Sequence, residues 1–163
     1  MIVQVIIAVI VVLVFHFLWP YILRRGAGYS GSNTKAVIWA FKLIDIKGKK
    51  LIDLGCGYGK VLKIAKKMGA HVTGIEIDPI RWFISIIRCR CKVLFGDMFK
   101  IDLSNYDVIY LFQWPSVNGK LARKFKKELR KGTYVISYMW EVPGLELVIY
   151  NKKLDIYIYK IRS

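Results

Sequence analysis

The sequence is short of acidic side chains. Asp and Glu number 11 against 27 Lys and Arg, so the formal net charge is +16 at pH 7. A protein this basic favours anionic partners, which include nucleic acids, acidic proteins and the phospholipid surface of a membrane. Net charge alone does not choose among these three.

Cysteine is also scarce. Cys56, Cys89 and Cys91 are an odd number, and no two of them have the Cys-x-x-Cys spacing of zinc sites and redox motifs. We therefore expect neither a disulfide framework nor a metal site, and a reducing compartment is the simplest interpretation. The 163 residues give room for one domain.

Charged side chains are missing from the first 23 residues. At about 1.5 Å per residue, a helix over 1–23 would be about 34 Å long, enough for the roughly 30 Å of bilayer hydrocarbon. A cleaved signal peptide is the alternative, but a basic amino-terminal region and a small-x-small cleavage site are lacking. Trp19 and Tyr21, followed by Arg24 and Arg25, are typical of an interfacial belt with a cytoplasmic flank. We expect a single-pass transmembrane helix over 1–23, with the folded domain in the cytoplasm.

Residues 24–34 are rich in Gly and Ser, which predicts a flexible linker. Tyr29 is an isolated aromatic residue in this stretch. It leaves open a second interpretation, in which the segment folds over a ligand as a lid. The folded domain would then occupy residues 35–163.

From Lys49 onward, short apolar runs alternate with amphipathic segments, a pattern that predicts an α/β fold with a mostly parallel sheet. Strands are predicted at 50–54, 71–77, 92–96, 107–112, 133–138, 145–150 and 154–161. Only Asn151-Lys152-Lys153 separates the last two, so we expect them to form an antiparallel hairpin.

Helices are predicted between these strands. The most basic, at 117–131, carries Leu121, Phe125 and Leu129 as one apolar stripe and Lys or Arg on most of its remaining surface. This is typical of a solvated helix face. Contact with anionic lipid headgroups is the second interpretation.

The first predicted strand breaks at its carboxyl end into glycines at alternate positions. Gly55, Gly57 and Gly59 permit left-handed dihedral angles and close approach of the backbone to a ligand. A helix beginning at Lys60 follows. The arrangement indicates a cofactor-binding loop, because ligands of open α/β sheets bind at the carboxyl ends of the strands.

Acidic residues follow the next two predicted strands. Glu76 lies about 20 residues beyond the loop, where an acid can hold ribose hydroxyls, although an exposed strand-end charge is the alternative. Asp97 is a candidate acceptor for the exocyclic amine of adenine, with Met98 over the ring, and a turn-forming aspartate is the alternative. Asp78, which precedes Pro79, is instead typical of a helix N-cap.

This series resembles the class I S-adenosylmethionine-dependent methyltransferases over residues 35–163. It consists of Asp53-Leu-Gly-Cys-Gly-Tyr-Gly59, Glu76, Asp97 and the terminal hairpin. The resemblance implies a Rossmann-like, seven-stranded mixed sheet of strand order 3-2-1-4-5-7-6, S-adenosyl-L-methionine as cofactor, and Asp53 near its amino-acid end. Nicotinamide dehydrogenases usually carry Gly-x-Gly-x-x-Gly, whereas the spacing here is Gly-x-Gly-x-Gly.

Three further segments are similar to small archaeal protein-lysine methyltransferases and their membrane-anchored mitochondrial relatives. They are Tyr29-Ser-Gly-Ser-Asn-Thr-Lys35, Leu129-Arg-Lys-Gly-Thr-Tyr-Val-Ile-Ser137 and Ile156-Tyr-Ile-Tyr-Lys160. The mitochondrial relatives modify lysines of membrane proteins, so the resemblance implies a membrane-tethered enzyme that methylates protein lysines, with Tyr29 near the cofactor. The prolines usual around Tyr29 in that family are missing here.

The segment after the fourth strand faces the transferred methyl group in this fold. It reads Gln113-Trp-Pro-Ser116, whereas enzymes acting on adenine or glutamine commonly carry Asn/Asp-Pro-Pro-Tyr/Phe. Gln113, Trp114 and Glu141 are candidates for the acceptor pocket. An RNA methyltransferase, a lipid or small-molecule methyltransferase, and a cofactor-binding protein without turnover are the alternative functions.

Overall fold

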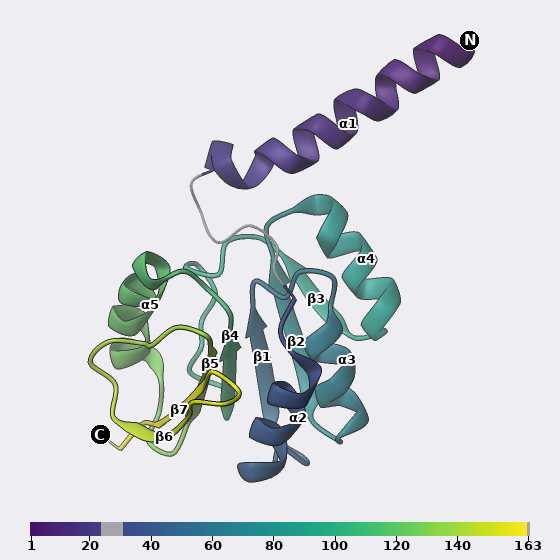
Figure 1. Cartoon of the computed structure of the whole chain (residues 1–163). Coiled ribbons are helices and arrows are strands. Elements are labelled where there is room, and N and C mark those ends of the chain that lie inside the picture. Colours follow the sequence, from purple (N-terminus) through teal and green to yellow (C-terminus); the bar gives the residue numbers. More distant parts are fainter. Residues whose placement is uncertain (24–30, 163) are drawn as a thin grey trace.

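The computed structural model describes residues 1–23 and 31–162, with the backbone alone for 16–23. Seven strands form one sheet in the order β3-β2-β1-β4-β5-β7-β6, which confirms the predicted fold class (Figure 1). The strands are β1 (Lys50–Leu54), β2 (His71–Glu76), β3 (Lys92–Phe95), β4 (Val108–Leu111), β5 (Tyr134–Tyr138), β6 (Leu147–Asn151) and β7 (Ile156–Lys160). Strands β1 to β5 pair in parallel, whereas β7 pairs antiparallel with both β5 and β6.

Helices cover both faces of the sheet. They are α2 (Thr34–Leu43), α3 (Lys60–Lys67), α4 (Pro79–Cys89) and α5 (Pro115–Glu128), preceded by α1 (Ile2–Leu23). Leu51 packs with α2 and α3, whereas its neighbour Ile52 packs with α5, because successive side chains of a strand point to opposite faces. Helices α2 and α3 therefore share one face, and α5 lies on the other.

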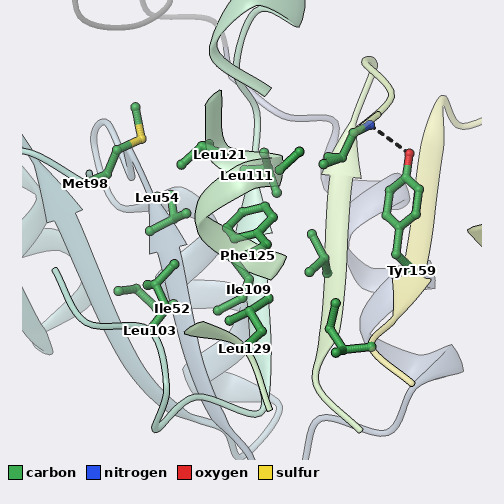
Figure 2. Packing of buried hydrophobic residues seen from close by; sticks show 14 of the residues in the cluster. Ile52, Leu54, Met98, Leu103, Ile109, Leu111, Leu121, Phe125, Leu129 and Tyr159 are labelled. Carbon is green, nitrogen blue, oxygen red and sulfur yellow. Dashed lines mark hydrogen bonds between the residues drawn. The ribbon is translucent and has the colours of Figure 1, made fainter. Parts of the chain in front are cut away.

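The predicted apolar stripe of α5 forms one half of the larger core. Leu121, Phe125 and Leu129 are buried against Ile109 and Leu111 of β4 (Figure 2). At roughly 25 cal/mol per Å² of apolar surface, each large side chain stabilises the fold by about 1.5–3 kcal/mol. This packing fixes α5 to β4, so the segment that joins them is held at both ends.

Asp78 caps α4, as its position before Pro79 predicts. Its Oδ1 accepts a hydrogen bond of 2.9 Å from the backbone N–H of Arg81, and Pro79 is the first residue of the helix. The cap satisfies one of the backbone donors that a helix leaves free at its start. Helix α4 therefore begins directly after β2 ends.

Helix α1 lies apart from the sheet in Figure 1, and the side chains of residues 2–15 are exposed. Over the described part of the chain, no helix is both long enough and apolar enough to cross a membrane. The side chains of Trp19 and Tyr21 lie outside the described residues, as do Arg24, Arg25 and Tyr29. The predicted linker, lid and domain boundaries stay predictions.

Cys89 and Cys91 form a disulfide, so the expectation that no disulfide forms is wrong. The residue between them, Arg90, has φ 48°, and this left-handed turn ends α4 and brings the two Cα atoms to 5.2 Å. Cys56 is free and buried. The number and spacing of the cysteines did not predict this bond, because one left-handed residue is enough to close so short a loop.

Candidate active site

The glycine loop lies at the carboxyl end of β1. Gly55, Gly57 and Gly59 have φ of 80°, 54° and 73°, the left-handed region in which a side chain is strained. The backbone N–H groups of Gly55 and Cys56 donate to the carbonyl of Ile75 on β2, at 2.9 and 3.0 Å. The loop is thereby attached to the neighbouring strand, with its glycine backbone in the conformation predicted for a cofactor loop.

Gln113 closes the side of this loop nearest to β4. Its Nε2 donates a hydrogen bond of 3.0 Å to the carbonyl of Leu54, and the side chain is buried. A Cβ atom added to Gly55 would lie 2.3 Å from this Nε2. Glycine at position 55 therefore provides space for Gln113 as well as conformational freedom.

Glu76 organises the loop from the end of β2. Its Oε2 accepts a hydrogen bond of 2.8 Å from the backbone N–H of Gly57, and its Oε1 accepts from the N–H groups of Ile77 and Asp78, each at 3.0 Å. Burial raises the pKa of Glu76, against the opposing effect of these three donors and of Arg81. A role for Glu76 toward a ribose stays a prediction, and its role in holding the loop was missed.

Asp53 is the second buried acid of the site. Burial, with a smaller contribution from the charge of Glu76, raises the pKa of Asp53 from 3.8 to about 8. Tyr110 on β4 is the cross-strand neighbour of Asp53, and its hydroxyl is buried. Two buried acids and a buried hydroxyl fit the ammonium group at the amino-acid end of S-adenosyl-L-methionine.

Asp97 and Met98 follow β3. Asp97 Oδ1 accepts a hydrogen bond of 3.0 Å from the N–H of Phe99, and its carbonyl accepts from Lys100 at 2.9 Å. Asp97 therefore shapes a turn, the alternative raised by its sequence context. Met98 is buried and packs in the core on the α5 face (Figure 2). Contact of either residue with adenine stays a prediction.

Aromatic residues gather where β4 and β5 end. Phe112 and Tyr138 meet edge to face with their ring centroids 4.8 Å apart. Trp114 is 51% exposed, and its ring centroid lies 6.1 Å from that of Trp140 in the segment after β5. The structure thus brings the predicted Trp114 beside a tryptophan that sequence analysis did not select, and Glu141 lies exposed next to it.

Asn118 is the functional candidate that sequence analysis missed most clearly. It is fully buried in α5, and its Nδ2 donates to the carbonyls of Trp140 at 3.3 Å and Glu141 at 3.0 Å. Ser137 Oγ also donates to the Trp140 carbonyl, at 2.5 Å. The signal was present in the sequence, because Asn118 is a polar residue three positions before Leu121 in the apolar stripe.

Two open hollows lie at the end of the sheet opposite the glycine loop. One, of about 500 Å³, is lined by residues that include Lys50, His71 and Lys92, and the other, of about 540 Å³, is lined by residues that include Lys47 and Arg130. Neither contains a glycine-loop residue. Lys50, His71 and Lys92 are the first residues of β1, β2 and β3, so the first hollow lies at the amino ends of the strands. Ligands of open α/β sheets bind at the other end, beyond the carboxyl ends of the strands. Among the described residues, no group of His, Cys, Asp and Glu is suited to hold a metal ion.

Comparison with known proteins gives matches of three kinds. The family model of the ANTKMT methyltransferase domain matches residues 53–148. A protein-lysine N-methyltransferase of Saccharolobus islandicus is 32% identical over 101 residues, which are 56% of this chain and 63% of that protein. The adenine nucleotide translocase lysine N-methyltransferase of Mus musculus is 28% identical over 131 residues, which are 74% of this chain and 56% of that protein. The chain thus spans less than two thirds of the length of either relative.

A solved structure is similar over most of its length. The RNA methyltransferase from Salinibacter ruber, in complex with S-adenosyl-L-homocysteine, is 26% identical with a TM-score of 0.75, and the match covers 82% of this chain and 95% of that chain. The ribosomal protein L11 methylase of Lactobacillus delbrueckii subsp. bulgaricus has a TM-score of 0.68 at 13% identity, which shows the fold alone.

Proposed function

Because the chain belongs to the family of the ANTKMT methyltransferase domain, we propose that it transfers a methyl group from S-adenosyl-L-methionine to lysine side chains of proteins. The observation that carries the proposal is the loop of Gly55, Gly57 and Gly59, held by Glu76 and bordered by the buried Asp53. The archaeal and murine relatives are both lysine N-methyltransferases by name, which supports the acceptor class.

Residues in and around the loop would bind different parts of the cofactor. Asp53 is suited to the ammonium group at its amino-acid end. Glu76 is suited to the ribose, because a carboxylate can accept more than the three hydrogen bonds that Glu76 already accepts. The turn at Asp97 borders the place proposed for adenine. When bound, the cofactor supplies a methyl group on a positively charged sulfur.

The aromatic residues at the end of β4 and β5 prepare the acceptor. An unperturbed lysine has a pKa of about 10.4 and is protonated at neutral pH, whereas only the neutral amine is a nucleophile. Trp114 and Trp140 exclude water from a side chain that lies against them, and desolvation lowers the pKa of a lysine amine. Asn118 keeps Trp140 in place. His71 begins β2, at the end of the strand away from the glycine loop, and is not placed to act as a base.

We further propose that residues 1–23 tether the enzyme to a membrane as a single span, with the domain in the cytoplasm. The span includes residues 16–23, whose side chains lie outside the described part of the chain in which no spanning helix is found. The support is the absence of charge in this segment, the exposure of its described side chains, and the sequence position of Arg24 and Arg25. A membrane protein is then a natural substrate. Membranes washed at high pH should retain the full chain, and protease added to sealed vesicles should reveal on which side the domain lies.

An RNA methyltransferase is the second candidate. It is supported by the similarity to the Salinibacter ruber enzyme and by the net charge of +16. Alanine at Trp114 or Trp140 would weaken stacking on a base as well as packing around a lysine chain, so mutagenesis of these residues alone does not separate the two functions.

Labelled cofactor separates them. Full-length protein is incubated with membrane extract and radioactive S-adenosyl-L-methionine, and the protein, RNA and lipid fractions are counted. Label in protein, on lysine by mass spectrometry, is the expected result, and the Gly57→Val variant should give none because a branched side chain is strained at φ 54°. Label in RNA or lipid alone would overturn the lysine proposal.

A further inference from the structure

The outer face of α4 presents large apolar side chains to solvent. Phe83 and Ile87 are 59% and 61% exposed, and Ile84 between them is also exposed. They lie opposite the buried side of the helix, which Ser85 and Cys89 form. A surface helix normally places polar residues on its outer side, so an apolar stripe here indicates contact with another apolar surface.

Phe95 is a fourth exposed apolar residue near this stripe. It ends β3 and is 57% exposed, with its ring centroid 5.6 Å from that of Trp82 on α4. Trp82 is itself fixed, because its indole N–H donates a hydrogen bond of 3.0 Å to the carbonyl of Val93. We call the exposed residues Phe83, Ile84, Ile87 and Phe95 the α4 patch.

Three of the four residues of the α4 patch lie in segment 60–92, and the surface charge of this segment has one sign, whereas Asp97 beside Phe95 is partly exposed. Between Lys60 and Lys92 the acidic residues are Glu76 and Asp78, and both are buried. The exposed cations of this segment are Lys63, Lys66, Lys67, Arg88, Arg90 and Lys92. Helices α3 and α4 are in contact, as Figure 1 shows, and the Lys66 ammonium donates to the carbonyl of Arg90 at the end of α4. The α4 patch therefore has cationic neighbours and no exposed carboxylate from this segment.

We propose that the α4 patch rests on the anionic surface of a lipid bilayer. Its apolar side chains would enter the boundary between headgroups and acyl chains, while Arg88 and Arg90 approach lipid phosphates. A second copy of the chain suits the patch less well, because a symmetric contact would bring two cationic rims together. A bilayer offers both the apolar layer and the negative charge.

This contact is separate from the proposed tether and has a different consequence. Residues 1–23 would hold the chain at the membrane, whereas the α4 patch would fix which way the domain faces. Helix α4 begins at Pro79, three residues after Glu76, so a domain lying on this patch keeps the candidate site close to the membrane surface. Lysines near the membrane would be within reach.

Site-specific labelling tests the contact in the full chain. An environment-sensitive fluorophore is attached to Cys in place of Phe83 (Phe83→Cys) or, as the matched control on the opposite face of the sheet, in place of Lys127 of α5 (Lys127→Cys). Cys56 is buried and the other two cysteines are paired, so the introduced thiol is the accessible one among the described residues. The labelled chains are placed in nanodiscs of phosphatidylcholine, with or without phosphatidylserine.

The expected result is a blue-shifted emission at position 83 in anionic nanodiscs, with quenching by nitroxide lipids several-fold stronger than at position 127. Both effects should fall in pure phosphatidylcholine and disappear when Ile87→Glu is added. A label at 83 that stays in water, or equal quenching at 127, would overturn the proposal. A shift that depends on protein concentration without lipid would indicate a second copy and overturn it too.

Failure of the tether is distinguishable from failure of this contact. If the chain does not remain with nanodiscs, the proposal for residues 1–23 is wrong. The same labelled chain, added to preformed vesicles containing phosphatidylserine, then reports on the α4 patch alone. A shift at position 83 in those vesicles supports the contact, and its absence refutes the contact. Cofactor binding by each variant shows that the fold is intact.

Discussion

Gly57 and Glu76 are joined by a hydrogen bond of 2.8 Å from the backbone N–H of the glycine to Oε2 of the glutamate. Because Oε1 of Glu76 accepts two further backbone bonds, one carboxylate fixes the loop after β1 to the loop after β2. The carboxylate that was predicted to bind a ligand thus also holds the backbone that forms the binding site.

Glu76→Gln should weaken cofactor binding by about 10- to 100-fold. The substitution turns one acceptor oxygen into a donor that faces backbone N–H groups, and a lost hydrogen bond to a charged group costs about 1.5–3 kcal/mol. Isothermal titration calorimetry measures the affinity. A cofactor analogue that lacks the ribose hydroxyls completes a double-mutant cycle. If Glu76→Gln costs the same with both ligands, Glu76 acts through the loop and not on the ribose.

The raised pKa of Asp53 predicts that cofactor binding depends on pH. Its pKa in the free protein is about 8, and a cationic ligand favours the charged carboxylate, so binding should release close to one proton at pH 7. Affinity should rise by up to about tenfold per pH unit below pH 8 and level off above it. Titrations in two buffers of different ionisation enthalpy measure the released proton. Asp53→Asn should flatten the profile, and an unchanged slope would exclude Asp53 as its origin.

The same substitution should stabilise the ligand-free protein. A carboxyl whose pKa is raised on folding contributes stability below its unfolded value, and this contribution is lost as the pH rises through the folded value of about 8. Asp53→Asn should therefore raise Tm at pH 8.5 and leave it nearly unchanged at pH 3.5. Thermal unfolding followed by circular dichroism at both pH values tests this. A lower Tm at pH 8.5 would contradict it.

Asn118 should act as a positioning residue for the acceptor. Asn118→Asp keeps the volume of the side chain but removes the Nδ2 donors to the carbonyls of Trp140 and Glu141. We expect KM for the protein substrate to rise about tenfold, equivalent to about 1.4 kcal/mol, while the Kd of the cofactor stays constant. Steady-state kinetics and calorimetry give the two values. Equal losses in both would indicate general destabilisation instead.

Two glycines in regular secondary structure should respond to alanine with opposite sign. A Cβ atom at Gly74 in β2 would lie 2.6 Å from Leu62 Cδ1 and 2.8 Å from Cys56 Sγ, whereas one at Gly119 in α5 would meet no atom within 4 Å. Gly74→Ala should lower the free energy of unfolding by about 1–3 kcal/mol through overpacking. Gly119→Ala should raise the free energy of unfolding by about 0.5–1 kcal/mol, because glycine is less favourable than alanine in the interior of a helix. Urea unfolding measures both, and a stabilising Gly74→Ala would show that the contact relaxes.

The fold was largely predictable because its signals are local. The glycine loop, the cap at Asp78 and the apolar stripe of α5 each depend on residues within a few positions of one another, and each occurs where it was expected. The strand order followed from a family resemblance and not from periodicity, since pairing partners such as β1 and β4 are distant in the sequence.

The parts of the site that were missed depend on contacts between distant segments. No local pattern says that Asn118 will donate to the backbone after β5, or that Trp140 will lie beside Trp114. The disulfide of Cys89 and Cys91 depends on the left-handed backbone of Arg90, a conformation that arginine rarely adopts. Such contacts and backbone conformations can be recognised only in the folded structure.

The hydrogen bond from Gln113 to the carbonyl of Leu54 joins residues that are 59 positions apart. This hydrogen bond exists only when β1 and β4 are both in place in the sheet. A ligand held beside this bond therefore binds the fully paired sheet and not the unfolded chain. At a hundred times its Kd, such a ligand adds about 2.7 kcal/mol to the free energy of unfolding. The cellular concentration of the ligand would then govern how long the protein survives, as well as how fast it works.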